Sequence, residues 1–476
     1  MGKTRRPGVK HLTRRQALGS MANMGLALGG LASPLTLTKT HPTRSGRGRT
    51  RPPNILVILS DNHRWDAMGI MGHPFVRTPA LDRLSREGAL FTNGYCTTPL
   101  CSPARASFLT GLYAYRHHVL NNAGRSSWSD EHVSFLELLQ AAAGYATAFI
   151  GKWHMPGSGL PRLRGVDRFV TFTIHGGQGR YFDCPLVVDG KRVRSHKRYI
   201  TEELTDRAIA FIDKHRARPF CVYLSHKAVH HPWQPPPDLE GLYAKQPVPL
   251  PSEANSWTGF TNGQIWGGFT RPIPSAYRAY METVTAMDRE IGRLLEHVAR
   301  RGLLDDTIVV YTSDNGFLFG EHKRVELRWP FEEVIRIPFI VRYPQAVAKR
   351  GRRRTQMALN IDLAPTLHAL AGLEVPENMD GMSLLPALRD PGAHGRRAWL
   401  VEYYRDFPHR VPAYQGVHTD RYLYVEYQEP FPPTLHDVLA DPEQRHDLMG
   451  TPEAARAVPR LQTMLAALRA GKRFDA

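Results

Sequence analysis

The segments "ILVILSDN" at residues 55–62 and "IVVYTSDN" at residues 308–315 share the pattern that decides the fold. In each segment, a run of mostly apolar residues leads directly into Ser-Asp-Asn. Short apolar runs of this kind predict strands that are buried on both faces, as in a parallel sheet. Ligands bind beyond the carboxyl ends of the strands in such sheets. We therefore expect the two Asp-Asn pairs, at 61–62 and 314–315, to lie at one edge of a sheet.

The chain that follows residue 54 alternates short strand patterns with longer helical patterns. "ATAFI" at 146–150 and "PFCVYLS" at 219–225 predict strands, and "EELTDRAIAFIDKHRA" at 202–217 predicts a helix. The segment 276–302 predicts a second, longer helix, because its apolar residues recur at steps of three and four. This alternation predicts an α/β fold with a large mixed, mostly parallel sheet flanked by helices.

The pattern changes after about residue 355, which indicates a second unit. Residues 413–427, "AYQGVHTDRYLYVEY", alternate in the manner of a β-hairpin. We divide the chain into an N-terminal segment at 1–53, a larger domain at 54–375 and a smaller C-terminal α+β subdomain at 376–476.

The N-terminal segment predicts export. The chain has a formal charge of +18, and residues 1–53 contain 11 Lys and Arg and no acidic residue. Arg14 and Arg15 precede a mildly apolar stretch rich in Ala, Gly and Met, a pattern that resembles a bacterial twin-arginine signal. The partner would be the twin-arginine export machinery, and the protein would be periplasmic or secreted. The alternative is an uncleaved anchor helix, which the Gly, Ser and Pro residues of the stretch disfavour.

The remaining basic residues do not indicate a nucleic-acid-binding protein. Most of the excess charge lies in the N-terminal segment, and the second basic cluster, "AKRGRRRT" at 348–355, has no interleaved aromatic residues. We predict a solvated loop there and no nucleic-acid partner.

Several polar residues follow the predicted strands and are expected to gather at one edge. They are Asp61, Asn62, Lys152, His154, His230, Asp314 and Asn315. Two carboxylates and two amide oxygens are hard donors that suit Ca²⁺ or Mg²⁺ better than zinc. On this pattern alone, Asp-Asn pairs that cap ordinary turns explain the sequence equally well.

The segment "TTPLCSPARASFLTGLY" at 97–113 favours the functional interpretation. Cys101 stands just before a predicted helix start, with Ser102-Pro103 as the cap and first-turn proline. A side chain at this position faces backbone N–H groups and the positive end of the helix, where an anion binds well. Arg105, four residues later, returns to the same side. The alternative is a buried cysteine with a surface arginine.

The segment "PLCSPARASFLTG" resembles the signature of the sulfatases in the alkaline-phosphatase-like superfamily. In that family the Cys of Cys-x-Pro-x-Arg is oxidised to formylglycine. Further segments agree in order, including "GKWH", "HKAVHHP", "TSDNG" and "GEH", so the resemblance covers about residues 54–450. It implies an alkaline-phosphatase-like fold, a sulfuric ester hydrolase activity and a bound divalent cation. It also implies a maturation partner, either a formylglycine-generating enzyme or an anaerobic equivalent.

The resemblance assigns a role to each candidate residue. Cys101, as formylglycine hydrate, would be the nucleophile, and His230 would protonate the leaving group. His154 would accept a proton from the nucleophile when sulfate departs, and Lys152 and Arg105 would neutralise negative charge. The cation ligands would be Asp61, Asn62, Asp314, Asn315 and the modified Cys101, although many relatives carry Asp or Gln in place of Asn62.

The chain departs from the family at one substrate-binding position. Relatives place a Lys four residues before the aromatic residue of the step that is Phe331-Glu332-Glu333 here, and this chain has Leu327 at that position. Leucine supplies neither charge nor hydrogen bond. Lys323 and Arg328 are the candidates to contact the substrate sulfate instead.

Three functions remain open from the sequence. The first is a hydrolase of sulfate monoesters, with a small sulfated glycan or an aryl sulfate as substrate. The second is a phosphonate or phosphate ester hydrolase of the same superfamily, since the same nucleophile serves both. The third is a non-catalytic binder of sulfated glycans, motivated by Leu327 and the basic surface.

Overall fold

The structure is a computed structural model that describes residues 51–123, 128–155, 157, 160–195, 197–250 and 272–475. The predicted export signal, including Arg14 and Arg15, lies outside the described residues. No described helix is both long enough and apolar enough to cross a membrane.

A ten-stranded sheet forms the centre of the larger unit, in the order β12-β2-β11-β8-β1-β7-β3-β4-β5-β6. The run from β8 to β4 is parallel, whereas β11 is antiparallel to both of its neighbours and β5 and β6 continue the other edge antiparallel. The prediction of a mixed, mostly parallel sheet is confirmed. The strands are β1 (Asn54–Ser60), β2 (Ala89–Tyr95), β3 (Ala146–Gly151), β4 (Arg168–Thr171), β5 (Leu186–Val188), β6 (Lys191–Val193), β7 (Phe220–Ser225), β8 (Thr307–Ser313), β11 (Phe339–Arg342) and β12 (Arg354–Leu359).

Helices cover both faces of this sheet, which explains why its central strands are apolar throughout. In β1, Leu56 and Ile58 pack into one core cluster, and Ile55, Val57 and Leu59 pack into the other. Each such side chain contributes about 1.5–3 kcal/mol on burial. The first face carries α2 (Pro79–Glu87), α7 (Ile200–His215) and α9 (Ile273–Arg300), and the second carries α3 (Cys101–Thr110), α5 (Phe135–Ala143), α11 (Leu363–Leu370) and α12 (Leu385–Arg389).

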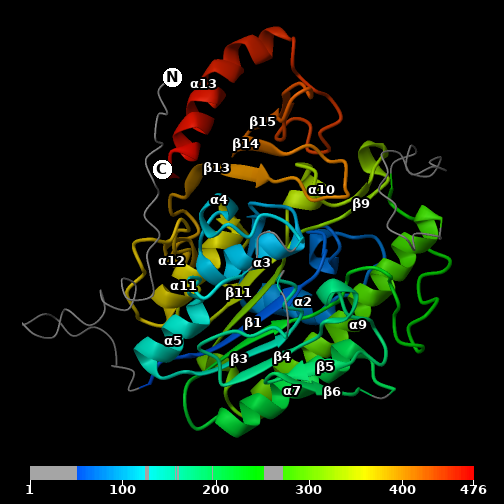
Figure 1. Ribbon diagram of the computed structural model, residues 1–476, viewed down its shortest axis with the longest axis vertical. Helices are drawn as coiled ribbons and strands as arrows, with labels where there is room; N and C mark the ends of the chain where they lie inside the picture. Colours follow the sequence, from blue (N-terminus) through cyan, green and yellow to red (C-terminus); the bar gives the residue numbers. More distant parts are fainter. Residues whose placement is uncertain are drawn as a thin grey trace, which may run out of the picture.

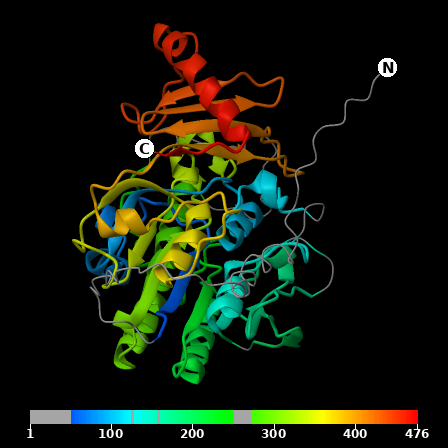
Figure 2. The same cartoon turned by 90° about the vertical axis from the view of Figure 1, so that its left-hand side faces the viewer.

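A second, antiparallel sheet forms the smaller C-terminal unit, in the order β16-β15-β14-β13-β17. The predicted hairpin is confirmed as β14 and β15, which pair antiparallel. The long helix α13 lies across this sheet at one end of the molecule, beyond the large sheet (Figure 1; Figure 2). The elements are β13 (Arg396–Tyr403), β14 (Tyr414–Thr419), β15 (Tyr422–Tyr427), β16 (Thr434–Asp437), α13 (Pro452–Arg469) and β17 (Phe474–Asp475).

The division between the two units at residue 376 stays a prediction. The small sheet begins at Arg396, whereas Leu388 of α12 still packs in the core of the large sheet. The remaining elements are short and are η1 (Gly69–Met71), α4 (Ala114–His117), α6 (Ile174–Gly177), η2 (Leu304–Asp306), β9 (Leu318–Phe319), η3 (Glu321–Lys323), β10 (Val325–Glu326), α10 (Glu332–Ile335) and η4 (Asn360–Asp362).

Buried polar contacts join the small sheet to the larger unit. Glu402 of β13 accepts hydrogen bonds from the backbone N–H groups of Ala114 (2.7 Å) and Tyr115 (3.3 Å) at the start of α4. Arg396 of the same strand donates two hydrogen bonds, of 2.7 and 2.9 Å, to the two carboxylate oxygens of Asp362. These contacts fix the small sheet next to the segment that follows α3.

Candidate active site

The two Ser-Asp-Asn steps lie side by side at the carboxyl ends of neighbouring strands. β1 and β8 pair in parallel with Ser60 opposite Ser313, so the two steps leave the sheet at the same level. The backbone N–H of Asn62 donates to Asp314 Oδ1 at 3.0 Å. Asp61 and Asp314 are both 0% exposed. The structure therefore brings together the residues that the sequence places more than 250 positions apart.

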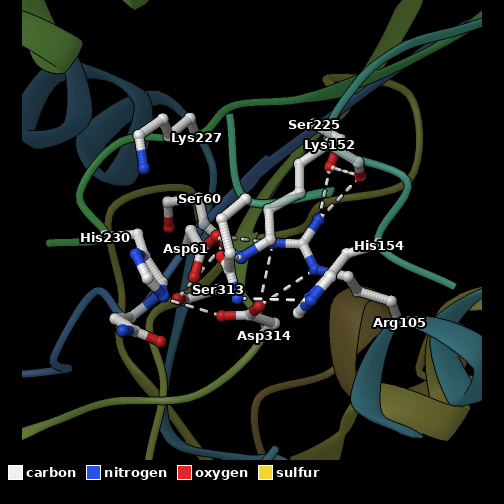
Figure 3. A network of polar contacts seen from close by, with 12 residues as sticks. Ser60, Asp61, Arg105, Lys152, His154, Ser225, Lys227, His230, Ser313 and Asp314 are labelled. Carbon is white, nitrogen blue, oxygen red and sulfur yellow. Dashed lines mark hydrogen bonds and ion pairs between the residues drawn. The ribbon is translucent and has the colours of Figure 1, made fainter. Parts of the chain in front are cut away.

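Arg105 of α3 links the two aspartates, as Figure 3 shows. Its Nε and Nη2 donate to Asp314 Oδ2 at 3.0 and 2.8 Å, and Nη2 lies 3.3 Å from Asp61 Oδ2. Its Nη1 donates to Ser225 Oγ at 2.6 Å and to the carbonyl of Lys152 at 3.0 Å. The guanidinium is thereby held in a fixed orientation, and the two carboxylates compensate its burial.

Cys101 is the first residue of α3, with Leu100 as its N-cap, so the helix begins two residues earlier than the predicted cap at Ser102 implies. The side chain is 0% exposed. Burial raises the pKa of the Cys101 thiol to about 12, so an unmodified thiol is protonated at neutral pH. A protonated thiol is a poor nucleophile and a poor metal ligand, because both roles need the thiolate.

The oxygen atoms around Cys101 fit a divalent cation. Ligand atoms of Asp61, Cys101 and His230 lie within 4.8 Å of one another. Within the described residues, the buried atoms Asp61 Oδ1 and Asn315 Oδ1 accept no hydrogen bond. Burial first, and the charge of Asp314 second, raise the pKa of Asp61. A cation would satisfy these oxygens and offset the repulsion between the carboxylates, and hard oxygen donors match Ca²⁺ or Mg²⁺.

Asn62 points its amide oxygen into the same cluster. Asn315 Nδ2 donates to Asn62 Oδ1 at 2.7 Å. An amide oxygen has two lone pairs, so one remains for a further partner. Asn62 also has a positive φ of 60°, a conformation that asparagine tolerates better than most residues.

Lys152 and His154 follow β3 and are joined by a glutamine. Lys152 Nζ donates to Asp61 Oδ2 and, at 2.6 Å, to Gln178 Oε1. Gln178 Nε2 donates to His154 Nε2 at 3.2 Å. The Gln178 oxygen accepts from Lys152, so the Gln178 nitrogen faces His154 and donates to it. His154 Nε2 is therefore the acceptor, and in the neutral ring Nδ1 carries the proton. Burial, followed by the charge of Lys152, lowers the pKa of His154 well below its ordinary value.

His230 lies on the opposite side of the cluster from His154 (Figure 3). Its Nδ1 is 2.7 Å from the carbonyl oxygen of His231, which assigns the proton to Nδ1 in the neutral ring. The Tyr181 hydroxyl donates to the His230 carbonyl at 2.7 Å. Burial and then Lys152 lower the pKa of His230 well below its ordinary value. His226 and His231 are also largely buried, but neither belongs to the group of possible ligands around Cys101.

Comparisons with known proteins agree with this geometry. The family described as Sulfatase matches residues 53–373. The chain belongs to the sulfatase family. The family described as N-sulphoglucosamine sulphohydrolase, C-terminal, matches residues 320–471.

Individual relatives of this sulfatase match most of its length. It is 31% identical to an N-acetylglucosamine-6-O-sulfatase of Bacteroides thetaiotaomicron, over 87% of this chain and 86% of the relative. It is 30% identical to the human N-acetylglucosamine-6-sulfatase, over 74% of this chain and 68% of the relative.

Solved structures show the same similarity. One is a complex with its substrate D-glucosamine-2-N,6-O-disulfate, with a TM-score of 0.79 and 30% identity, covering 89% of this chain and 98% of that chain. A phosphonate monoester hydrolase of Agrobacterium radiobacter shares the fold, with a TM-score of 0.72 and 21% identity, covering 88% of this chain and 96% of that chain. Together with the two relatives, the substrate-bound structure identifies the chain as a sulfuric ester hydrolase.

The two substrate-binding candidates of this sulfatase occupy different environments. Lys323 is exposed at the end of η3. Arg328 is 1% exposed and forms ion pairs with Glu326 and, at 2.6 Å, with Asp406. The positive charge of Arg328 contributes to lowering the pKa of His154, so it acts on the same site. Leu327 is fully buried.

Four further residues at or beside the site are not indicated by the sequence patterns, namely Gln178, Asn122, Asp406 and Lys227. Gln178 orders Lys152 and His154, as described above. Asp406 Oδ1 accepts from the N–H of Asn122 at 3.1 Å, and Asn122 Oδ1 accepts from the N–H of Ser102 at 3.0 Å, so the chain beyond β13 supports the start of α3. Lys227 is 1% exposed beside the site. The segment "HKAVHHP" contains Lys227, but a predicted loop does not indicate which side chains turn inward.

Proposed function

We propose that this sulfatase removes a 6-O-sulfate group from a glucosamine residue of a sulfated glycan. The observation that carries the proposal is the pair of buried cationic side chains, Arg105 and Lys152, whose charges act on Cys101, with His230 beside that residue. The names of the two relatives and the substrate of the similar solved structure support the sugar and the position of the sulfate.

The proposed nucleophile is formylglycine made from Cys101 by a maturation enzyme. The motif around Cys101 and the high pKa of its thiol support this step, because an unmodified thiol would be inactive at neutral pH. Hydrated formylglycine would supply a hydroxyl nucleophile, which a bound Ca²⁺ or Mg²⁺ would acidify. Asp61, Asn62, Asp314 and Asn315 would hold that cation together with the modified side chain.

The remaining residues would position and protonate the substrate. His230 would donate a proton to the leaving alcohol oxygen. This role requires a protonated Nε2, and the negative charge of a bound sulfate ester would favour the imidazolium form that burial disfavours. Lys152 and Arg105 would face the sulfuryl oxygens, where fixed cations stabilise charge in the transition state.

His154 would act after the ester bond has broken. The geometry assigns its neutral proton to Nδ1 and leaves Nε2 as the acceptor beside Gln178. Its low pKa keeps it neutral, so it would accept the proton that the nucleophile gives up when sulfate leaves. Arg328, which is buried, and Lys323, which is exposed, are the proposed contacts for the substrate sulfate in place of the lysine that relatives carry at the position of Leu327.

The proposal also includes export of the protein from the cytoplasm. The segment 1–53 would direct the protein through the twin-arginine machinery to a bacterial periplasm or the medium. The cellular experiment is fractionation of a bacterial host, with Arg14→Lys/Arg15→Lys as the matched variant. Retention of that variant in the cytoplasm, with the unchanged chain exported, is the expected result, and equal export of both would contradict it.

Sulfate release tests the activity. The chain should be produced with a formylglycine-generating enzyme and offered N-acetylglucosamine-6-sulfate, glucosamine-2-N,6-O-disulfate, an aryl sulfate and an aryl phosphodiester. We expect sulfate release from the 6-O-sulfated sugars to be fastest. Faster cleavage of the phosphodiester would favour the phosphonate or phosphate ester hydrolase instead. The mass of the peptide containing residue 101 checks the modification, and an unmodified cysteine in active protein would overturn the proposed nucleophile.

A further inference from the structure

Lys227 is a buried lysine directly after β7, on the His230 side of the site (Figure 3). The backbone on its C-terminal side is clamped to the end of β1. The N–H of Asp61 donates to the Ala228 carbonyl at 2.9 Å, and the N–H of Val229 donates to the Asp61 carbonyl at 2.8 Å. The position of Lys227 is therefore fixed relative to Asp61, and its side chain is 1% exposed.

The ammonium group of Lys227 has little compensation for its burial. Its Nζ donates to the carbonyl of His231 at 3.2 Å and lies 5.0 Å from the centre of the Tyr181 ring. No carboxylate of the described residues lies within ion-pair distance of it. An ammonium has three N–H donors, and burying it without a counter-charge costs several kcal/mol. Lys152, by contrast, has Asp61 as its partner.

The surroundings of Lys227 connect it with the nucleophile. Burial first, and the charge of Lys152 second, lower the pKa of Lys227 to about 7, whereas Asp61 and Cys101 act in the opposite direction. The backbone contacts of Ala228 and Val229 with Asp61, whose carboxylate accepts from Lys152 Nζ, place Lys227 beside the same cluster. An anionic group next to Cys101 would be the missing counter-charge.

We propose that Lys227 is a substrate-binding residue that donates a hydrogen bond to a sulfuryl oxygen of the ester held at residue 101. This inference rests on the proposed function and deepens it. Leu327, between η3 and α10, is fully buried and cannot supply the positive charge that relatives place at this position. Lys227 supplies a cation from the β7 side instead, so Arg105, Lys152 and Lys227 together surround the sulfate.

The competing interpretation is purely structural, with Lys227 serving to hold the His231 carbonyl and the Tyr181 ring. Three variants separate the two. Lys227→Met keeps the length and removes the charge, Lys227→Arg keeps the charge, and Lys245→Met removes an exposed lysine from the segment that follows.

The first measurement is steady-state kinetics of the matured enzyme with its best sulfated substrate and inorganic sulfate as inhibitor. For Lys227→Met we expect kcat/KM to fall about 100-fold, the size of effect seen for one preorganised donor. We expect the inhibition constant for sulfate to rise at least about tenfold, since one charge-assisted hydrogen bond is lost. Lys227→Arg should recover part of both losses, and Lys245→Met should match the wild type. An unchanged sulfate inhibition constant in Lys227→Met would overturn the inference.

The second measurement does not depend on turnover. Inorganic sulfate is titrated calorimetrically, with Ca²⁺ present, into the wild-type chain and the Lys227→Met chain, both carrying unmodified Cys101. Weaker binding to the variant, with no ester hydrolysis by the matured wild type, would support sulfate binding by Lys227 and refute the proposed function. Ester hydrolysis by the matured wild type, with equal sulfate binding by both chains, would support the proposed function and refute sulfate binding by Lys227. If Lys227→Met does not fold, Lys227→Gln takes its place, and a folded variant that binds sulfate like the wild type refutes the inference.

Discussion

Two buried aspartates of this sulfatase, Asp61 and Asp362, differ in how completely their oxygens are bonded. Both are 0% exposed. Asp362 receives two hydrogen bonds from Arg396 and two more from the N–H groups of Leu359 (2.8 Å) and Met382 (2.7 Å). Asp61 Oδ1 receives none within the described residues, and only Oδ2 contacts Lys152 and Arg105.

Asp61 and Asp362 are equally buried, so incomplete bonding, and not burial, marks Asp61 as the carboxylate with an oxygen available to a ligand. Asp362, whose four hydrogen bonds come from the fold, holds two parts of the chain together. A partly bonded aspartate among several cations retains an oxygen that can bind a ligand, at a cost in stability. We therefore expect substitutions among the residues around Asp61 to reduce activity, and substitutions in the Asp362–Arg396 ion pair to reduce stability.

The largest expected effect is at Cys101. Cys101→Ala should lower sulfate release by on the order of 10⁴-fold or more, because the nucleophile is lost. The Asp362–Arg396 pair is untouched, so thermal unfolding should remain close to that of the wild type. Assays of sulfate release and calorimetry measure the two effects, and substantial residual turnover would show that another residue attacks the ester.

Asp314→Asn tests the functional side of the comparison. The substitution removes one negative charge from the cation site and one partner of Arg105, and we expect kcat/KM to fall about 10²–10³-fold. The cation dependence should shift as well, so half-maximal activity should require more Ca²⁺ or Mg²⁺ after treatment with a chelator. An unaltered metal titration would remove Asp314 from the ligand set.

Asp362→Asn tests the structural side with the same chemical change. The Arg396 guanidinium loses its carboxylate, and we expect the free energy of unfolding to fall by about 3 kcal/mol or more. The turnover of the folded fraction should stay within about threefold of the wild type. Urea unfolding and activity at low temperature measure both quantities, and a large loss of turnover without a loss of stability would reverse the assignment.

Glu402 is an intermediate case, because it is buried and bonded but lacks a cation. Burial raises its pKa from an ordinary value of 4.5 to about 7. Between these values the folded state holds a proton that the unfolded state has lost, so stability falls as pH rises, by about 3 kcal/mol in total. Glu402→Gln cannot titrate. The wild type should therefore lose about 3 kcal/mol relative to this variant between pH 4.5 and 7.5, as measured by urea unfolding, and a constant difference would contradict the raised pKa.

The smallest expected effect is at Gln178. Gln178→Ala breaks the link between Lys152 and His154, and we expect kcat/KM to fall about tenfold through less precise positioning. Gln140→Ala is the matched control, because Gln140 donates to Thr147 and Asp167 and does not contact the site. Equal activities of the two variants would show that the link has no catalytic importance.

The sequence by itself determined the central strands and the polar residues that follow them. Apolar runs fixed β1, β3, β7 and β8, and the step from each strand into polar residues indicated the edge where Asp61, Lys152, His230 and Asp314 meet. The motif at 97–113 identified Cys101 and Arg105. The strand inferences succeed because strand periodicity acts over a few residues.

Only the tertiary structure decided which further side chains reach the site. Gln178 comes from the loop around α6, Asp406 from the segment between β13 and β14, and Lys227 from the turn after β7, where the sequence indicated only His230. It also separated Arg328, buried between two carboxylates, from Lys323, which is exposed. The physical reason is that loop paths and side-chain directions depend on contacts between distant segments, and no local period encodes them.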